Sequence, residues 1–440
     1  MIRIPCGRLG SDHSEGPLGG PKGLYMPEDT VLKFDEHNTD ALLHAIDEAV
    51  NGTPVFDIHT HLSPPEFGEL CLWGIDELVR YHYLIAELFR SNPIKPEQYW
   101  GMTKEQQADI IWDTLFVRNT PVSEACRGVV CVMSALGLDP GASTLKDARE
   151  YFRSVSVEDH ITNVFEIANV SQVVMTNDPF HPRESKVWKG SGRQDERFHA
   201  ALRMDPLIND WDNIAKREGF ANAAAARKFL DEWIARMNPL YMAVSLPYDF
   251  LYPENSPRSM VLRDVVIPTA KAHNLPFAMM IGVKRQINPL LGDAGDSVAR
   301  ANLSSVEQIC RENPDNKFLV TVLSRENQHE LCVIARKFGN LMPFGCWWFL
   351  NNPSIIAEIT AERLEMLGTS FIPQHSDARV LEQVIYKWTH SRRIIADILF
   401  NQYMELTLDG FPLTSQHIRR DVEKLYSGNF ESLVGIGSGS

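Results

Sequence analysis

Short apolar runs alternate with helical patterns along most of this chain. Each run ends in polar residues, as expected of buried strands that stop at a surface or a site. The runs are "PVFDIHTH", "SQVVMTNDP", "HAALRMDP", "YMAVSLPYD", "PFAMMIGVKR", "KFLVTVLSREN", "LMPFGCWWFLNN" and "SFIPQHSD". We therefore expect eight strands, most of them followed by a helix.

The predicted helices have apolar positions three and four residues apart. The first, "TDALLHAIDEAVNG", ends at a glycine and leads directly into the first strand. A long, mostly helical segment, about residues 62–168, separates the first strand from the second and includes "WGIDELVRYHYLIAELFR" and "TKEQQADIIWDTLFV". Later helices are "ANAAAARKFLDEWIARM", "VLRDVVIPTAKAH", "NQHELCVIARKF", "SIIAEITAERLEML" and "ARVLEQVIYKWTHSRRIIADIL".

Strands that alternate with helices favour parallel pairing, because each crossover helix returns the chain to the same end of the sheet. Eight such units predict an α/β fold, a (β/α)8 TIM barrel with a helical insertion between strands 1 and 2. An open doubly wound sheet is the alternative, but it normally has a glycine-rich phosphate loop after its first strand. Here the first strand ends in histidines and "SPP" instead.

The domain organisation follows from where these patterns start and stop. Residues 36–432 are predicted to form a single barrel domain that includes the insertion. Residues 1–35 are rich in glycine, proline and serine and are expected to form a flexible N-terminal arm. Residues 433–440, which end in "GIGSGS", are expected to form a flexible tail.

Composition and charge narrow the function classes. The 440 residues have a formal net charge of −14, which argues against a nucleic-acid-binding protein. The seven cysteines form no CxxC pair and favour free thiols in a reducing compartment over a disulfide framework. The N-terminus lacks a secretory signal, and no run of 18 apolar residues follows. We expect a cytoplasmic protein with no membrane contact.

Two histidines in the first strand suggest a metal site. Alternation along a strand would place Asp57, His59 and His61 on one face. In a closed barrel, strand 8 lies beside strand 1, so Asp377 could complete a His-His-Asp set for zinc, manganese or iron. Three protein ligands leave positions open for substrate. The alternatives are ordinary loop histidines and a helix-capping role for Asp377; His375 points to the other face.

Other polar residues end the remaining strands, where the reactive groups of a barrel lie. The guanidinium groups of Arg203, Arg285 and Arg379 could bind a carboxylate through planar, bidentate hydrogen bonds. Of the tryptophans Trp347 and Trp348, one is expected to pack outward while the other walls the mouth of the barrel. His82 and Tyr83 lie on a helix of the insertion, where packing is the simpler interpretation of both side chains.

Several of these motifs together resemble the uronate isomerases of the amidohydrolase superfamily. They are "DIHTHL", "YHYLIAE", "VVMTNDP", "ALRMDP", "FGCWWFLNNP" and "FIPQHSDARVLEQVIYKW". The resemblance runs from about Asn38 to the end of the last helix. Two positions depart from the common family pattern: Met280 stands where many members carry a histidine, and Ser245 where many carry Asp-His.

The resemblance implies an intramolecular aldose–ketose isomerase acting in carbohydrate metabolism, in glucuronate catabolism. Its reaction would convert D-glucuronate to D-fructuronate, and D-galacturonate to D-tagaturonate, by proton transfer from C2 to C1 through an enediol. The substrate would be a small hexuronate, and homo-oligomerisation is left open. Two alternatives are kept. One is a metal-dependent hydrolase of the same superfamily, acting on a sugar-acid lactone or related carboxylate, and the other is a non-catalytic sugar-acid binder or structural barrel.

The resemblance also implies roles for individual residues. His59, His61 and Asp377 match the metal site, for which we expect a divalent ion, with zinc as first choice. Asp377, Tyr83 and Arg379 match catalytic positions. The expected substrate-binding residues are His82, Arg203, Arg285, Trp347 and Trp348.

Overall fold

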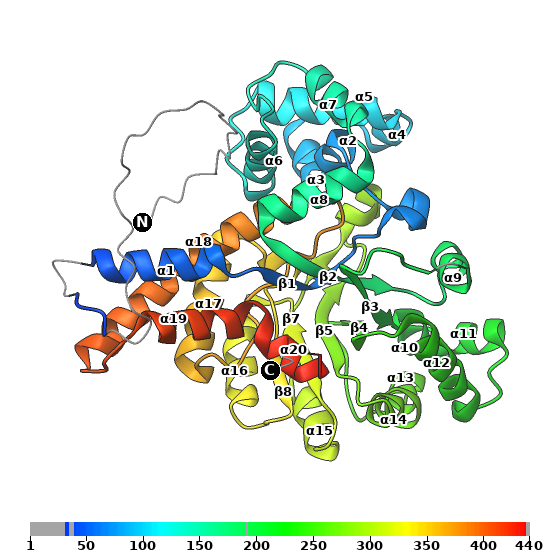
Figure 1. Ribbon diagram of the computed structural model, residues 1–440. Coiled ribbons are helices and arrows are strands. Elements are labelled where there is room, and N and C mark those ends of the chain that lie inside the picture. Colours follow the sequence, from blue (N-terminus) through cyan, green and yellow to red (C-terminus); the bar gives the residue numbers. More distant parts are fainter. Residues whose placement is uncertain (1–30, 35–38, 191, 437–440) are drawn as a thin grey trace.

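A curled parallel sheet forms the centre of the molecule, and helices surround it (Figure 1). The computed structural model describes residues 31–34, 39–190 and 192–436. Seven parallel strands pair in the order β1-β2-β3-β4-β5-β7-β8. They are β1 Val55–Thr60, β2 Val170–Asn177, β3 Phe198–Arg203, β4 Tyr241–Pro247, β5 Phe277–Lys284, β7 Phe318–Val322 and β8 Leu341–Pro343.

The predicted barrel is confirmed as a TIM-barrel-like α/β fold, with two differences in its strands. A short strand that the pattern did not predict, β6 Ser297–Val298, pairs antiparallel with β5. The prediction of an eighth strand over "SFIPQHSD" is wrong. Residues 371–378, hereafter the strand-eight segment, are all described and contribute only the isolated bridge between Phe344 and Ile372.

Two main-chain hydrogen bonds close the ring between the strand-eight segment and β1. The amide of Asp377 donates to the carbonyl of His59 at 3.1 Å, and the amide of His61 donates to the carbonyl of Ala378 at 2.8 Å. We call this junction the seam. The first strand and the last barrel segment thus meet although more than three hundred residues separate them, as the closed-barrel prediction requires.

The strands bury alternate residues on two faces of the sheet, as barrel strands do. The outer face packs against helices, and the inner face forms a separate core. Inner-face residues of this core include Val174, Ala201, Ala243, Ala278, Met280, Leu319, Phe344 and Ile372. Phe430 of α20 (Asn429–Val434) covers one end of this inner core, with its ring 5.2 Å from that of Phe56.

A bulge in β1 changes which residues face inward. Asp57 pairs with Val173 and Thr60 with Met175, so β1 advances three residues where β2 advances two. The extra residue inverts the alternation, because successive side chains point to opposite faces. Asp57 therefore faces outward, against the expectation that it shares a face with the two histidines, whereas His59 and His61 face inward.

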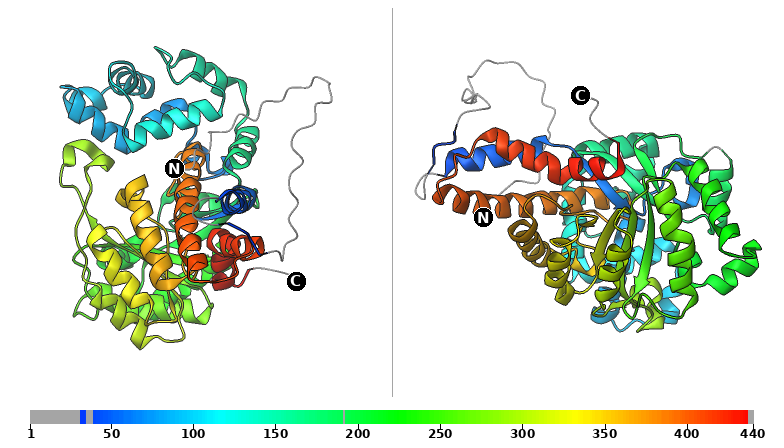
Figure 2. Two further views of the ribbon diagram at one scale, coloured as in Figure 1. Left: turned by 90° about the vertical axis from the view of Figure 1, so that its left-hand side faces the viewer. Right: turned by 90° about the horizontal axis from the view of Figure 1, so that it is seen from below.

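The helical insertion between β1 and β2 lies at one end of the barrel (Figures 1 and 2). Its elements are η1 Pro65–Leu70, α2 Ile75–Val79, α3 His82–Ser91, α4 Pro96–Trp100, α5 Lys104–Trp112, η2 Asp113–Val117, α6 Glu124–Ala135, α7 Lys146–Ser154 and α8 Val157–Ala168. The helix expected over "WGIDELVRYHYLIAELFR" is broken, because Tyr81 takes a non-helical ψ of 138° between α2 and α3. This break places His82 at the start of a helix.

The remaining helices lie outside the sheet, where they pack on strands or on one another. They are α1 Asp40–Gly52, α9 Pro182–Lys189, α10 Asp205–Asn209, α11 Trp211–Glu218, α12 Ala223–Met237, α13 Pro257–Val261, η3 Leu262–Val266, α14 Ile267–Ala272, α15 Ser304–Glu312, α16 Gln328–Ala335, α17 Pro353–Leu367, α18 Gln383–Leu408 and α19 Ser415–Glu423. Helix α18 begins at Gln383, five residues later than the pattern suggested. The side chain of Gln383 accepts the amides of Arg379 and Val380, which keeps those residues outside the helix.

Most of the two predicted terminal segments lies outside the described residues. Within the expected N-terminal arm, Val31 bridges Thr414, and the amide of Leu32 donates to the carbonyl of Leu413. Within the expected tail of residues 433–440, the first two residues end α20 and residues 437–440 are outside the described part. Among the described helices, none combines the length and apolarity that crossing a membrane requires.

Candidate active site

A small cavity of about 60 Å³ lies at the carboxyl ends of the strands, where barrels place their reactive groups. It collects residues from β1, β2, β3, β4 and β5, the loops after β5 and β8, the strand-eight segment and α3. The lining residues are His59, His61, His82, Thr176, Arg203, Asp205, Ala243, Val244, Ser245, Met280, Arg285, Trp347, Trp348, Asp377 and Arg379. The structure therefore brings together every predicted site residue except Tyr83.

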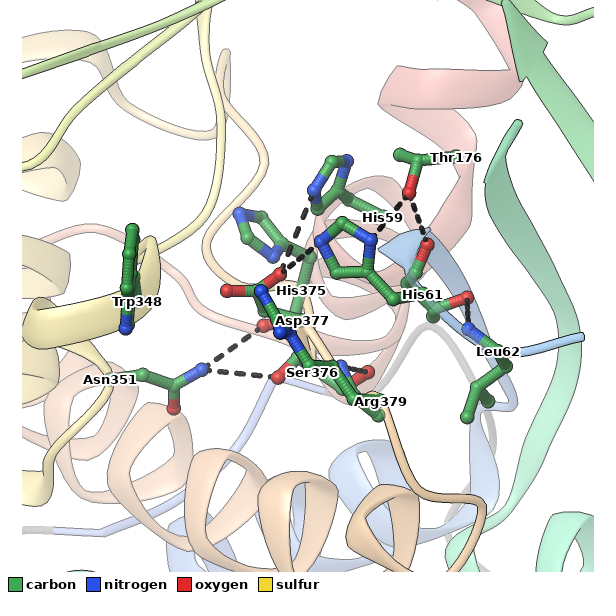
Figure 3. A network of polar contacts seen from close by, with 12 residues as sticks. His59, His61, Leu62, Thr176, Trp348, Asn351, His375, Ser376, Asp377 and Arg379 are labelled. Atoms are coloured by element: carbon green, nitrogen blue, oxygen red, sulfur yellow. Dashed lines mark hydrogen bonds and ion pairs between the residues drawn. The ribbon is translucent and has the colours of Figure 1, made fainter. Parts of the chain in front are cut away.

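Ligand atoms of His59, His61 and Asp377 lie within 4.8 Å of one another, which fits a metal ion (Figure 3). Asp377 Oδ1 is 3.7 Å from His59 Nε2 and 3.3 Å from His61 Nε2. His59 Nε2 and Asp377 Oδ1 are both buried without a hydrogen-bond partner. Since buried polar atoms are normally paired, these two atoms point to a missing partner between them.

The hydrogen bonds of His59 fix its tautomer. Its Nδ1 lies 3.1 Å from Tyr241 Oη, and that hydroxyl donates its single proton to the carbonyl of Ile58 at 2.7 Å. His59 Nδ1 must therefore carry the proton and donate it to Tyr241, which leaves a lone pair on Nε2. That lone pair faces the carboxylate of Asp377, an arrangement that favours a cation between them.

His61 repeats this arrangement with a threonine. Its Nδ1 lies 2.8 Å from Thr176 Oγ1, whose hydroxyl donates to the carbonyl of Thr60 at 3.0 Å. His61 Nδ1 is again the donor, and its Nε2 lone pair also faces Asp377. Burial lowers the pKa of both His59 and His61, so both imidazoles are neutral near pH 7, the form in which histidine binds metals.

Asp377 occupies an unusual backbone conformation. Its φ is 52°, in the left-handed region that aspartate and asparagine tolerate better than most residues. Because α18 begins only at Gln383, Asp377 does not cap that helix, and the capping alternative is wrong. The conformation instead turns the carboxylate towards His59 and His61 (Figure 3).

The three arginines stand around the cavity with different partners. Arg203 ends β3 and forms a two-point ion pair with Asp205 at 2.9 and 3.1 Å. Arg285 follows β5, is 57% exposed and pairs with Asp296. Arg379 pairs with Asp293 at 3.7 Å. Three guanidinium groups on one small cavity make it attractive to an anion.

Both tryptophans of the pair line the cavity, so the expectation that one packs outward is wrong. Trp347 and Trp348 are 4% and 8% exposed. Trp348, which has a φ of 46°, donates from Nε1 to His82 Nε2 at 3.2 Å. Burial lowers the pKa of His82 to about 3, so His82 is a neutral acceptor in this contact.

Tyr83 lies next to His82 but is not among the cavity-lining residues. Its ring stacks on Phe349 with centroids 6.2 Å apart, and it contacts the ring of His82 at 4.6 Å. Burial raises the pKa of Tyr83 well above its usual value, so its hydroxyl keeps its proton.

His375 packs against the inner-face residues His59 and Phe344, although alternation along a strand would place it on the other face, and it is not among the cavity-lining residues. It is fully buried, its ring is 5.0 Å from that of His59, and neither ring nitrogen has a hydrogen-bond partner. Gly345 makes room for it: a Cβ at Gly345, whose φ is 63°, would lie 1.9 Å from the His375 ring. Burial lowers the pKa of His375 to about 4.

Sequence reasoning missed Thr176, Asp205 and Tyr241. Each orients a predicted site residue by a hydrogen bond or ion pair. Thr176 and Asp205 lie in the motifs "VVMTNDP" and "ALRMDP" at strand ends, so their positions could have indicated them. Tyr241 begins β4, far from the strand end, and no signal in the sequence marks it.

A wider hollow of about 680 Å³ adjoins the cavity and shares His82 and Arg379 with it. Its walls come from the insertion, including Tyr81 and Trp100, and from η4 (Pro289–Gly295). Trp100 Nε1 donates to the carbonyl of Leu290 at 3.0 Å across this hollow. The buried cavity therefore has a neighbouring space open to solvent.

Comparison with solved structures decides the family. A uronate isomerase from Bacillus halodurans is 52% identical, covers 91% of this chain and 98% of its own, and superposes with a TM-score of 0.89. This chain belongs to the uronate isomerase family. Comparison with protein-family models and with curated proteins found no match.

More distant structures share the fold of this uronate isomerase family member. Glucuronate isomerase from Caulobacter crescentus is 14% identical, with a TM-score of 0.73 over 94% of this chain and 98% of its own. A putative metal-dependent hydrolase from Lactobacillus casei is 15% identical, with a TM-score of 0.56 over 89% of this chain and 97% of its own. At these identities, the likeness extends to the architecture alone.

Proposed function

We propose that this protein is a uronate isomerase that converts D-glucuronate to D-fructuronate, and D-galacturonate to D-tagaturonate. The 52% identity to a uronate isomerase over most of both chains supports this most strongly. The site agrees with it, because a carboxylate, neutral imidazoles and three arginines surround one cavity. The substrate would approach through the wider hollow that shares His82 and Arg379 with the cavity.

Asp377 is the proposed base. Its Oδ1 faces the two histidines, which leaves Oδ2 for the C2 proton of the open-chain sugar. As Asp377 removes that proton, a C1–C2 double bond forms and the aldehyde oxygen becomes an enediolate. The O2 proton then passes to O1 as the C2 carbonyl forms, and Asp377 returns its proton to C1, which leaves a hydroxyl group on C1 and a free carboxylate on Asp377. A single well-placed base of this kind contributes about 100- to 10,000-fold in rate.

Arg379 and Tyr83 are proposed to stabilise the enediolate. Arg379 lies two residues after Asp377 and lines the same cavity, so its fixed positive charge can face the developing oxyanion. The protonated hydroxyl of Tyr83 would serve as the second donor, since its ring adjoins that of His82 at the cavity wall. Tyr83→Phe should lower kcat by about 100-fold.

The remaining predicted residues are proposed to hold the substrate. Arg203 and Arg285 would bind the hexuronate carboxylate, Arg203 with its orientation set by Asp205. His82 and the tryptophans Trp347 and Trp348 would contact sugar hydroxyls and flat carbon faces. These contacts would convert binding energy into alignment of C2 with Asp377.

A divalent ion, zinc by our proposal, would be held by His59, His61 and Asp377. Two neutral imidazoles and a carboxylate oxygen suit zinc and leave a coordination position for substrate. The ion would supply a Lewis acid that polarises and orients a sugar oxygen. Elemental analysis of the purified protein tests the metal's identity.

The decisive experiment follows each uronate by NMR in D₂O, with metal content assayed in the same samples. Conversion to the ketouronate, with deuterium at C2 of recovered aldose, supports the proposal. A parallel screen with sugar-acid lactones and esters tests the hydrolase alternative. Hydrolysis of those compounds without turnover of any uronate would reject the isomerase assignment.

A further inference from the structure

Asp57 has no part in the proposed chemistry, yet it is a buried carboxylate beside the site. It is 0% exposed and faces away from the cavity because of the bulge in β1. Its Oδ1 accepts the amide of Ser376 at 3.0 Å, and its Oδ2 accepts Trp388 Nε1 of α18 at 2.9 Å. One side chain therefore joins β1, the strand-eight segment and α18.

We propose that Asp57 is a positioning residue for the isomerisation: through the Ser376 amide it fixes the strand-eight segment in the conformation that aims Asp377 at the cavity. The proposal rests on the function proposed above for Asp377. It assigns a role to a residue that is neither among the cavity-lining residues nor a member of the proposed metal cluster.

The strand-eight segment needs such a device because a sheet ladder does not hold it. After the bridge at Ile372, its two main-chain bonds to β1 are those of Asp377 and Ala378 at the seam. A left-handed conformation such as that of Asp377 costs about 1–2 kcal/mol and persists only where the surroundings enforce it. The Ser376 amide, immediately before Asp377, is the group that Asp57 holds.

Ser376 is held from two sides. Asp57 accepts its amide, while Asn351 Nδ2 donates to its carbonyl at 3.3 Å and, more weakly, to that of His375 at 3.5 Å. With both of its main-chain polar groups fixed, the peptide before Asp377 has little freedom to rotate. We call Asp57 and Asn351, which hold Ser376 from two sides, the clamp. Asp57 is its charged member, and hydrogen bonds to charged groups are about twice as strong as neutral ones.

The same strand supplies the charged member of the clamp and two proposed metal ligands. Asp57 lies on the outer face of β1 and holds Ser376, while His59 and His61 lie on the inner face and approach Asp377. A shift of the strand-eight segment relative to β1 is therefore opposed on both faces. Alignment matters because a displacement of about 1 Å can cost about 100-fold in rate.

Three variants separate positioning from general stability. Asp57→Ala removes the acceptor of the Ser376 amide and of the Trp388 indole. Trp388→Phe removes the indole donor and keeps the bond to Ser376. The double variant Asp57→Asn with Trp388→Phe lets an amide oxygen accept from Ser376 without opposing the indole N–H.

The test measures kcat and KM on glucuronate at a temperature where circular dichroism shows every variant folded. We expect Asp57→Ala to lose about 100-fold in kcat with KM within threefold, whereas Trp388→Phe and the double variant stay within about tenfold of wild type. Deuterium exchange at C2 should fall in parallel with kcat.

Three outcomes would overturn the inference: wild-type kcat in Asp57→Ala, an equal kcat loss in Trp388→Phe, or no recovery in the double variant. If Asp57→Ala does not fold, the double variant is compared with Asp57→Leu in the Trp388→Phe background, which has no oxygen at position 57 and should lose about 100-fold in kcat while the double variant stays within tenfold of wild type. Failure of the wild-type protein to turn over any uronate would instead reject the proposed function, which the same assay shows separately.

Discussion

The middle of the barrel and the seam hold their residues in place by different means. From β2 to β5, parallel strands pair in continuous ladders, and most of their side chains are apolar and buried. At the seam, two main-chain bonds join β1 to a segment without a ladder, and buried polar side chains do the rest. The ladder, by which we mean the paired strands β2 to β5, makes the barrel rigid. The seam instead fixes the orientation of individual side chains, among them the proposed base.

The comparison predicts that the seam governs activity more than folding. Asp377→Asn should reduce turnover of glucuronate by about 1,000-fold, since it removes the proposed base. The fold should survive because asparagine tolerates the left-handed conformation at this position. Turnover and the free energy of unfolding should be measured on the same preparation; near wild-type turnover would remove Asp377 from its role.

The opposite behaviour is expected in the ladder. Ile281 on β5 is fully buried against the outer helices. Ile281→Ala should lower the free energy of unfolding by about 3 kcal/mol through lost burial and a cavity. In urea titrations this loss should be plain, while kcat of the folded protein stays within about threefold. A collapse of kcat without a change in stability would contradict the division between the two regions.

A metal ion should stabilise the seam in particular, because its proposed ligands come from β1 and the strand-eight segment. At a free zinc concentration about 100 times Kd, the gain in unfolding free energy would be about 2.7 kcal/mol. Removing the ion with a chelator should lower Tm in wild type and leave Tm of His59→Asn unchanged. An equal chelator effect in both proteins would place the ion elsewhere.

Lowering the pH should lower the free energy of unfolding through His390 on α18, the helix that packs behind the seam. His390 on α18 is 7% exposed, and burial lowers its pKa to about 3. The unfolded chain binds a proton near pH 6.5 while the folded chain does not, so this stability is present above pH 6.5 and is lost as pH falls towards 3. Between pH 8 and pH 5, wild type should lose about 2 kcal/mol more unfolding free energy than His390→Gln. Equal losses would show that His390 titrates normally.

Most of the ladder could be predicted from sequence, since apolar runs at regular spacing mark strands that are buried on both faces. The strand-eight segment was mistaken for a strand for the same reason. Phe371 and Ile372 open an apolar run, but the residues after them, all within the described part of the chain, form no continuous ladder: the Ser376 amide bonds to the side chain of Asp57, and main-chain bonds to the first strand occur only at the seam. Sequence periodicity does not distinguish these two kinds of partner.

The candidate site was predicted better than its surroundings. His59, His61 and Asp377 come together as the closed-barrel prediction required. The outward turn of Asp57 could not be predicted, because a bulge depends on how two strands pair and not on the pattern of one. The inward position of both tryptophans depends likewise on the positive φ of Trp348, a conformation that bulky residues rarely adopt.

The close approach of Gly345 to the ring of His375 limits which residues both positions can carry, in engineered variants and in related natural sequences. Any side chain at Gly345 would collide with that imidazole and would also strain a backbone with a φ of 63°. A change at one position therefore restricts what the other can accept, and the two should vary as a pair among related sequences. Grafting this loop into another barrel would require that both residues be carried over together.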